Sequence, residues 1–243
     1  AKDFPGGFVW FIEQFMPNAK AFDQMGKITS ALAMTILDAI AAGTLAAIIA
    51  FVLAVIASRV SGVGGPVQMV IRAFATVLRN IPTVAWGFIL LFSFKQAEFT
   101  GFLALFFKSL GFLTRAFIET IDEADAGSIE ALKATGASKL QIIVHGVFPL
   151  SRTQVVSWVL YKIETNFRDA TLVGMLTGTG IGFVFNWYYR TFKYPTAGLV
   201  IICIAVAVIV VEAVSNYVRR RIGAPDGHSG EMRASRGKIK VRV

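Results

Sequence analysis

The sequence predicts an all-α integral membrane protein with about five transmembrane helices. Of its 243 residues, 55% are hydrophobic and only 16% are charged, which leaves more apolar surface than a soluble domain of this size can bury. Several apolar runs approach the roughly 20 residues that a helix needs to cross a bilayer. The net charge of +9 gathers largely after the last of these runs, so it indicates a membrane orientation and not a nucleic-acid partner.

The N-terminal segment, residues 1–28, is expected to lie at the membrane interface. Its residues 8–16 are rich in aromatic side chains with Glu13 among them, and they are too few to cross the bilayer. The first span is expected within residues 29–57, because no charge interrupts the run that begins at Ala39.

The second span, residues 67–94, must pass through Pro82, because the run after this proline is too short to cross alone. A proline at that depth predicts a kink, with the freed carbonyl satisfied by neighbouring protein. Arg79 precedes it closely, so Arg79 and Pro82 are candidates for a gating or kinking position. The third span, residues 99–121, carries Lys108, whose long stem can snorkel to an interface or face a protein interior.

The loop from residue 122 to residue 152 is polar and mixed in charge, with helix-forming residues on both sides of Gly136. This composition indicates two short helices outside the membrane. A fourth span is expected from about residue 153 to residue 175, and a fifth, apolar span covers residues 197–218. A glycine-rich stretch between them precedes aromatic side chains that suit the headgroup region.

The basic residues set the expected orientation. The transmembrane domain is predicted at residues 29–220, and the tail that follows, residues 221–243, is rich in arginine and lysine. Basic segments stay on the cytoplasmic side, so the C-terminus is expected in the cytoplasm. Counting back across the spans places the loop at 122–152 in the cytoplasm and the N-terminal segment outside.

The fourth span carries the most informative polar residues, which are Glu164, Asn166, Arg168 and Asp169. A charge at the centre of a membrane helix costs about 2.5–3.5 kcal/mol, so these side chains are expected to face protein or water. Glu164 and Arg168 are four residues apart, which places them on one helical face where they can pair. Two interpretations stay open: a structural ion pair, or a translocation path in which Arg168 offers donors to an anion.

The cytoplasmic loop contains a pattern with a known resemblance. It reads Glu130-Ala131-Leu132-Lys133-Ala134-Thr135-Gly136, and Pro149 precedes the next span. This pattern resembles the EAA signature of ABC importer permeases, in which coupling helices dock in a groove of a separate ATPase. The resemblance implies ATPase-coupling roles for Glu130, Ala131, Gly136 and Pro149.

Further segments are similar to the permeases of phosphonate ABC importers, across nearly all of residues 29–220. They are Thr35–Asp38, Gly43–Ala46, Leu78–Trp86, Phe117–Asp122, Glu164–Ala170 and Gly180–Gly182. Gly180 and Gly182 are taken as a second gating or kinking position.

The sequence departs from the family patterns at a few positions. Leu132 replaces the third alanine of the signature, and Gly146 and Phe148 stand where isoleucine and leucine are preferred. Thr177 and Thr179 stand in a segment that usually carries more glycines.

The resemblance implies the permease fold of methionine importers, in a bacterial cytoplasmic (inner) membrane. It also implies a second copy of the chain, two ATP-binding cassette subunits that hold ATP and Mg²⁺, and a periplasmic or lipid-anchored substrate-binding protein. The expected substrate is phosphonate, phosphite or another small phosphorus oxyanion. No catalytic, cofactor or metal site is expected on this chain, whose sequence has no phosphate-binding loop motif.

Two alternatives stay open from the sequence. The nearer one is an ABC permease for another small solute, namely methionine, taurine or glycine betaine. The other is an ion-driven secondary carrier, in which Glu164, Arg168 and Asp169 would form a proton or ion relay. No internal repeat of the kind found in many such carriers is visible in the sequence.

Overall fold

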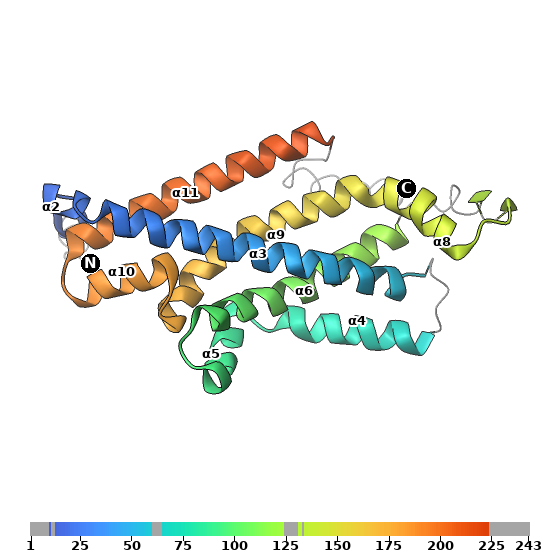
Figure 1. The fold of residues 1–243 in the computed structure, drawn as a ribbon, viewed down its shortest axis with the longest axis horizontal. Helices are drawn as coiled ribbons and strands as arrows, with labels where there is room; N and C mark the ends of the chain where they lie inside the picture. The colour runs from blue at the N-terminus through green and yellow to red at the C-terminus, as the bar shows by residue number, and fades with distance from the viewer. Residues whose placement is uncertain (1–9, 11–12, 60–64, 124–130, 133, 224–243) are drawn as a thin grey trace, which may run out of the picture. The chain divides into compact units, whose positions relative to one another are not determined.

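The computed structural model describes residues 10, 13–59, 65–123, 131–132 and 134–223 of the chain. Within these residues every regular element is a helix (Figure 1). In chain order they are α2 (Ala19–Phe22), α3 (Met25–Ala57), α4 (Gly65–Asn80), α5 (Thr83–Phe94), α6 (Glu98–Asp122), α8 (Lys139–Ile142), the π-helix η1 (Ile143–Val147), α9 (Phe148–Thr177), α10 (Gly180–Arg190) and α11 (Tyr194–Arg221).

Three of these helices, α3, α6 and α11, are each long and apolar enough to cross a membrane. Two further pairs, α4 with α5 and η1–α9 with α10, pass the same test together, although each pair is bent at a short break. The described residues therefore hold three spans, or up to five if each bent pair is one span. The predicted fold class, all-α with about five transmembrane helices, is confirmed.

The chain divides into two compact units, each of which gathers distant parts of the sequence. Unit 1 comprises Ala1–Ala42, Pro82–Phe106 and Thr165–Val211. Unit 2 comprises Gly43–Ile81, Phe107–Glu164 and Glu212–Val243. Four of the five boundaries fall inside α3, α6, α9 and α11, so each of these helices contributes to both units, and the fifth falls between α4 and α5.

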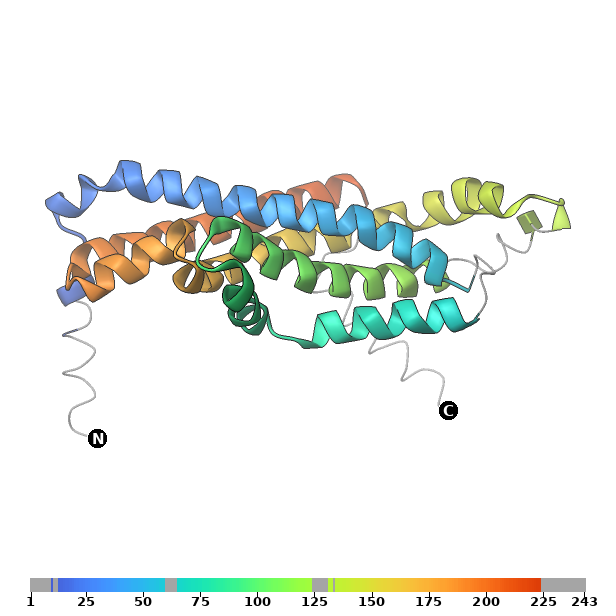
Figure 2. The same ribbon diagram turned by 60° about the horizontal axis from the view of Figure 1, so that its bottom comes forward.

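The core of unit 1 joins α2, the start of α3, α10 and the start of α11, which lie close together in both views (Figures 1 and 2). Its buried side chains are Ala21, Ile28, Ile181, Tyr188, Ala197, Leu199 and Val200. The Tyr188 hydroxyl donates to Oε1 of Gln24 at 3.1 Å, which satisfies its one polar group. At Gly198 an added Cβ would overlap the carbonyl oxygen of Phe15, so this glycine permits close packing of the N-terminal segment.

In unit 2, α4 runs beside the second half of α6 (Figure 2). The contact needs Gly111, because a Cβ there would lie 2.6 Å from Cβ of Leu78 and 2.9 Å from the carbonyl oxygen of Ala75. Both α4 residues are buried. Close backbone approach through small residues is the usual means of helix association in membranes, where lipid is as apolar as the side chains.

The helix that leads into the predicted fourth span begins well before residue 153. A helical segment starts at Lys139 and passes through the π-helix into α9, so Pro149 lies in the first turn of α9 and not in a loop. The amide of Phe148 donates to the carbonyl of Ile143, the wide hydrogen bond of a π-helix. Because Pro149 has no N–H and its ring crowds the preceding turn, a wider turn at this point lets the helix continue.

Candidate coupling and translocation sites

The described part of the coupling segment, residues 131–132 and 134–136, is helical at first and ends in a glycine turn, within unit 2. Ala131 and Leu132 are helical, and the amide of Thr135 donates to the carbonyl of Ala131 at 3.3 Å. Gly136 has a φ of 77°, which is the left-handed conformation that ends helices and that glycine adopts at no steric cost. Ala131, Gly136 and Pro149 are all exposed, while Glu130 lies outside the described residues.

Leu132 packs against the π-helix that leads into α9. A Cβ added at Gly146 would lie 2.8 Å from Cδ1 of Leu132, so the leucine fills the space that a side chain at position 146 would take. Two of the three departures from the coupling signature are therefore in contact, with a large residue at 132 and a small one at 146. This contact joins the coupling segment to the long helix α9.

The end of α6 is tied to two other helices by Asp122, the last residue of α6. Its Oδ2 accepts from the guanidinium of Arg72 at 2.7 Å, and its Oδ1 accepts from the amide of Arg59 at 2.8 Å. Arg72 also donates to the carbonyl of Ala57 at 3.0 Å. One carboxylate thus links the ends of α3 and α6 to α4. No residue spacing along the chain indicated this network.

The predicted path residues of α9 fall into different surroundings. Glu164 accepts a hydrogen bond from the guanidinium of Arg219 at 3.1 Å, and both side chains are almost fully buried. Asn166 is 0% exposed. Arg168 is exposed, and Asp169 accepts from the hydroxyl of Thr83 at 2.6 Å. Arg219 is a partner for Glu164 that lies in another span, where spacing along one helix could not reveal it.

The break at Pro82 is held by a lysine from α6. The ammonium group of Lys108 donates to the carbonyl oxygens of Arg79 at 2.5 Å and of Ile81 at 3.2 Å. Neighbouring protein therefore satisfies carbonyls at the break, as the sequence predicts, and a cation lies at the carboxyl end of α4 where the helix dipole favours it. Pro82 itself precedes α5, and its carbonyl accepts from the amide of Trp86 at 3.1 Å. The role of Lys108 was not foreseen beyond a choice between snorkelling and facing protein.

The second predicted kink separates α9 from α10, which are bent by 53° relative to each other. Gly180 has a φ of 60°, and the amide of Ile181 donates to the hydroxyl of Thr35 at 2.9 Å, so a side chain of α3 caps α10. Gly182 lies so close to α9 that an added Cβ would overlap the carbonyl oxygen of Thr171. Both glycines are therefore required by the bend.

A small polar cavity adjoins this bend within unit 1. It measures about 10 Å³, room for roughly one water molecule, and its polar lining comes from Thr35, Asp38, Thr177 and Thr179. The hydroxyls of Thr177 and Thr179 are 2.9 Å apart, so the two threonines that replace expected glycines hydrogen-bond to each other. This bond stabilises the turn between α9 and α10.

Comparison with known proteins gives the family. Residues 46–224 match the family described as binding-protein-dependent transport system inner membrane component. The chain belongs to this family. It is therefore a membrane component of a transport system, as the sequence predicts.

The similar proteins align with different fractions of this chain. The chain is 30% identical to the phosphite transport system permease protein PtxC of Stutzerimonas stutzeri, over 76% of this chain and 68% of that protein. It is 29% identical to the phosphate-import permease protein PhnE of Mycolicibacterium smegmatis, over 87% of this chain but only 40% of that protein. It is 34% identical to a permease protein named for a cryptic phosphonate transport system of Escherichia coli, over 49% of this chain and 97% of that protein.

Solved structures confirm the fold at low sequence identity. The crystal structure of an amino acid ABC transporter with histidines superposes with a TM-score of 0.65 at 15% identity, over 82% of this chain and 98% of that one. An inward-facing form of the MetNI methionine ABC transporter also superposes with a TM-score of 0.65 at 15% identity, over 81% of this chain and 98% of that one. The predicted methionine-importer-like permease fold is therefore confirmed.

Proposed function

We propose that this chain is the permease of an ATP-driven importer for a small phosphorus oxyanion, and that its coupling segment receives force from a separate ATPase. The observation that carries this proposal is the exposed turn at Gly136, whose preceding helix packs through Leu132 onto the helix that becomes α9. Because this exposed segment packs on a long helix, a displacement of the segment can be transmitted to that helix.

The proposed partners follow from this role. A second copy of the chain forms the other half of the path, two ATP-binding cassette subunits dock on the coupling segments, and a substrate-binding protein delivers the ligand on the opposite side. ATP and Mg²⁺ bind to the ATPase subunits, and this chain carries no cofactor. The arginines at the end of α11, Arg219 to Arg221, support a cytoplasmic C-terminus and a site for the coupling segment on the same side of the inner membrane.

The proposed mechanism is alternating access. ATP binding closes the ATPase dimer and moves the segment between Ala131 and Gly136. The contact of Leu132 with Gly146 passes this motion to α9, and the carboxylate of Asp122 passes it to α3 and α4 through Arg59 and Arg72. The spans then open the path outward, and release of ADP reverses the motion. The chain itself makes and breaks no covalent bond.

The substrate class is supported by the names of the relatives, which cover phosphite, phosphate and phosphonate transport. These ligands share a tetrahedral phosphorus with negatively charged oxygens. The structures of amino acid and methionine transporters support only the fold, because their identity to this chain is 15%. Membership of a binding-protein-dependent family favours the ABC importer over an ion-driven carrier.

The proposal is tested by ligand-stimulated ATP hydrolysis. The chain is expressed with its cognate ATPase and binding protein, purified as a complex and reconstituted in lipid nanodiscs. We expect methylphosphonate, phosphite or phosphate to raise ATP hydrolysis several-fold in the presence of the binding protein, and methionine to have no effect. Stimulation by methionine alone would overturn the substrate class, and failure of the chain to retain an ATPase would overturn the coupling role.

A further inference from the structure

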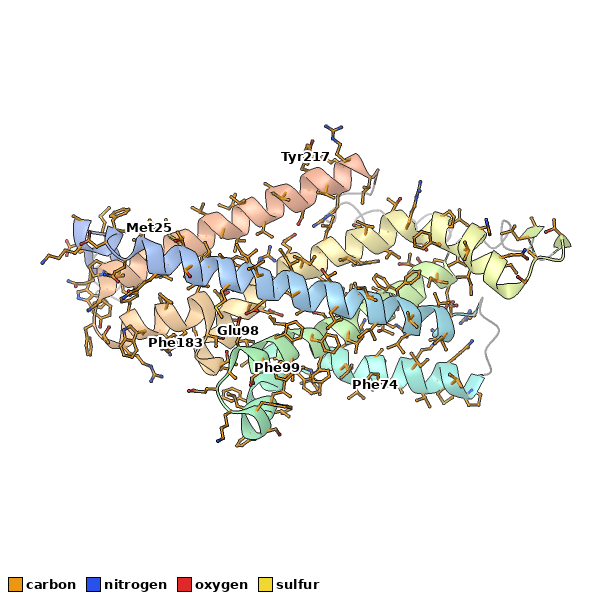
Figure 3. The ribbon with its side chains drawn as sticks, viewed as in Figure 1. Met25, Phe74, Glu98, Phe99, Phe183 and Tyr217 are labelled. Atoms are coloured by element: carbon orange, nitrogen blue, oxygen red, sulfur yellow. The ribbon has the colours of Figure 1, made fainter. Side chains whose placement is uncertain are left out.

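Helix α4 presents three faces with different chemistry. One face packs on α6 through Ala75 and Leu78. A second face is apolar and exposed, and its members are Val70 and Phe74, of which Phe74 is labelled in Figure 3. The third face is polar. A helix with one apolar and one charged exposed face suits two different surroundings, one apolar and one aqueous.

The polar face of α4 comprises Gln68, Arg72, Thr76 and Arg79. Steps of three or four residues place these side chains on one side of the helix. With a rise of 1.5 Å per residue, Arg79 lies about 10 Å further along the axis than Arg72. The two arginines therefore form successive cationic positions along one line.

An open cavity of about 700 Å³ lies beside this face. Its lining includes Gln68, Arg72 and Thr76 from α4, together with Arg59 from the end of α3. A small oxyanion fits there with several waters, each of which takes about 30 Å³. Asp122 is paired with Arg72 at 2.7 Å, and this leaves the cationic group of Arg59 in excess around the cavity.

The polar face continues along α4 as far as Arg79. Asp122 ends α6 beside Arg72, whereas Lys108, whose ammonium group contacts the carbonyl of Arg79, lies about four helical turns earlier in α6. Arg79 is exposed, and no ion pair of its side chain is found among the residues that the structure describes. An arginine at such depth is unfavourable against lipid and is found facing water or protein.

We propose that the polar face of α4 lines the cytoplasmic half of the translocation path, and that Arg59 beside the cavity and Arg79 further along α4 guide an oxyanion along it. The identity of the ligand as an oxyanion rests on the proposed function. Contact of this face with water and its attraction for anions do not depend on which ligand is transported. Guanidinium groups suit tetrahedral oxyanions because their N–H donors form a fork that matches paired oxygens. Successive sites allow an anion to pass from one arginine to the next without being held tightly.

The test measures how fast charged reagents reach a cysteine on this face in the assembled importer. Cys203, the one cysteine of the chain, is first replaced by alanine. Thr76→Cys is then treated with anionic sulfonatoethyl methanethiosulfonate or with cationic trimethylammonioethyl methanethiosulfonate, which modify thiols in contact with water. Val70→Cys is the matched control, because it lies on the exposed apolar face of the same helix.

After normalisation to a free thiol, we expect Thr76→Cys to react about five times faster or more with the anionic reagent than with the cationic one. Adding Arg79→Gln should lower this ratio toward one, whereas Arg79→Lys should keep it. Val70→Cys should react slowly with both reagents. Met69→Cys, which also lines the cavity and is 72% exposed in the native chain, repeats the measurement if Thr76→Cys does not assemble.

Equal reactivity with the two reagents, or no reaction at the positions that line the cavity, would overturn the inference. A packed interface with a second copy of the chain would give the latter result. Because no transported substrate takes part, this test can fail while phosphite still stimulates ATP hydrolysis. It can also succeed when phosphite does not, so the two proposals fail independently.

Discussion

Substitutions at Gly136 test the backbone conformation of the coupling turn without changing its side-chain packing. No atom lies within 4 Å of a Cβ added at this position, so a side chain there costs only backbone strain at a φ of 77°. For an ordinary residue such as alanine this strain is about 1–2 kcal/mol, which lowers the equilibrium constant for the native turn by roughly 5- to 30-fold. Asparagine tolerates the left-handed region better, and proline cannot enter it because its φ is fixed near −65°.

ATP-dependent uptake is therefore predicted to fall in the order wild type, Gly136→Asn, Gly136→Ala and Gly136→Pro, and Gly136→Pro is predicted to be inactive. The assay measures uptake of radiolabelled ligand into proteoliposomes that contain the complete complex, with ATPase retention on an affinity column as a second readout. Membrane insertion of each variant is checked by its yield in the detergent extract. Wild-type uptake by Gly136→Pro would refute the coupling role of this turn.

Three further predictions concern packing and buried charge. Gly146→Ala alone should lower the melting temperature of the complex, because the added methyl group crowds Leu132. Leu132→Ala in the same chain should recover most of that loss. Additive effects of the two substitutions in thermal unfolding would contradict a direct contact between the two positions. Lys108→Met should lower the free energy of unfolding by about 1–3 kcal/mol for each carbonyl left without a donor. Lys108→Arg should keep much of the wild-type stability, because arginine also donates hydrogen bonds. Equal melting temperatures for the two variants would exclude a role of Lys108 in satisfying these carbonyls. Glu164→Gln should cost about 3–5 kcal/mol because it leaves Arg219 charged and buried, whereas Glu164→Leu with Arg219→Met should be much better tolerated.

The fold was predictable because its signals are local. Apolar runs near the length of a bilayer crossing located the spans, and Pro82 indicated a break in the second one. The structure adds that the break is complete, with α4 ending at Asn80 and α5 beginning at Thr83. The bend at Gly180 and Gly182 was also foreseen, since glycines at such spacing signal a backbone that needs positive φ or close approach.

The contacts between distant segments could not be predicted from one sequence. Glu164 has a neighbour four residues away that suggested a pair, yet the hydrogen bond to Arg219 joins two spans. The network around Asp122 likewise joins residues from three helices. The continuity of the helix from Lys139 into α9 was not indicated either, and the π-helix before Pro149 accommodates the missing N–H of this proline.

The departures from the coupling signature illustrate the same limit. Leu132 and Gly146 each look unfavourable when compared singly with the family pattern. In the structure the Leu132 side chain occupies the space that a side chain at position 146 would take. This contact between the two positions is visible only in three dimensions.

The central claim, that this chain moves its ligand only when an ATPase acts on the coupling segment, is tested most directly by transport into proteoliposomes. The permease is reconstituted alone, with its ATPase and binding protein, and with the same partners after Gly136→Pro. The account predicts ATP-dependent accumulation of labelled phosphite or methylphosphonate in the second preparation and none in the other two. Accumulation by the permease alone, or equal accumulation with Gly136→Pro, would contradict it.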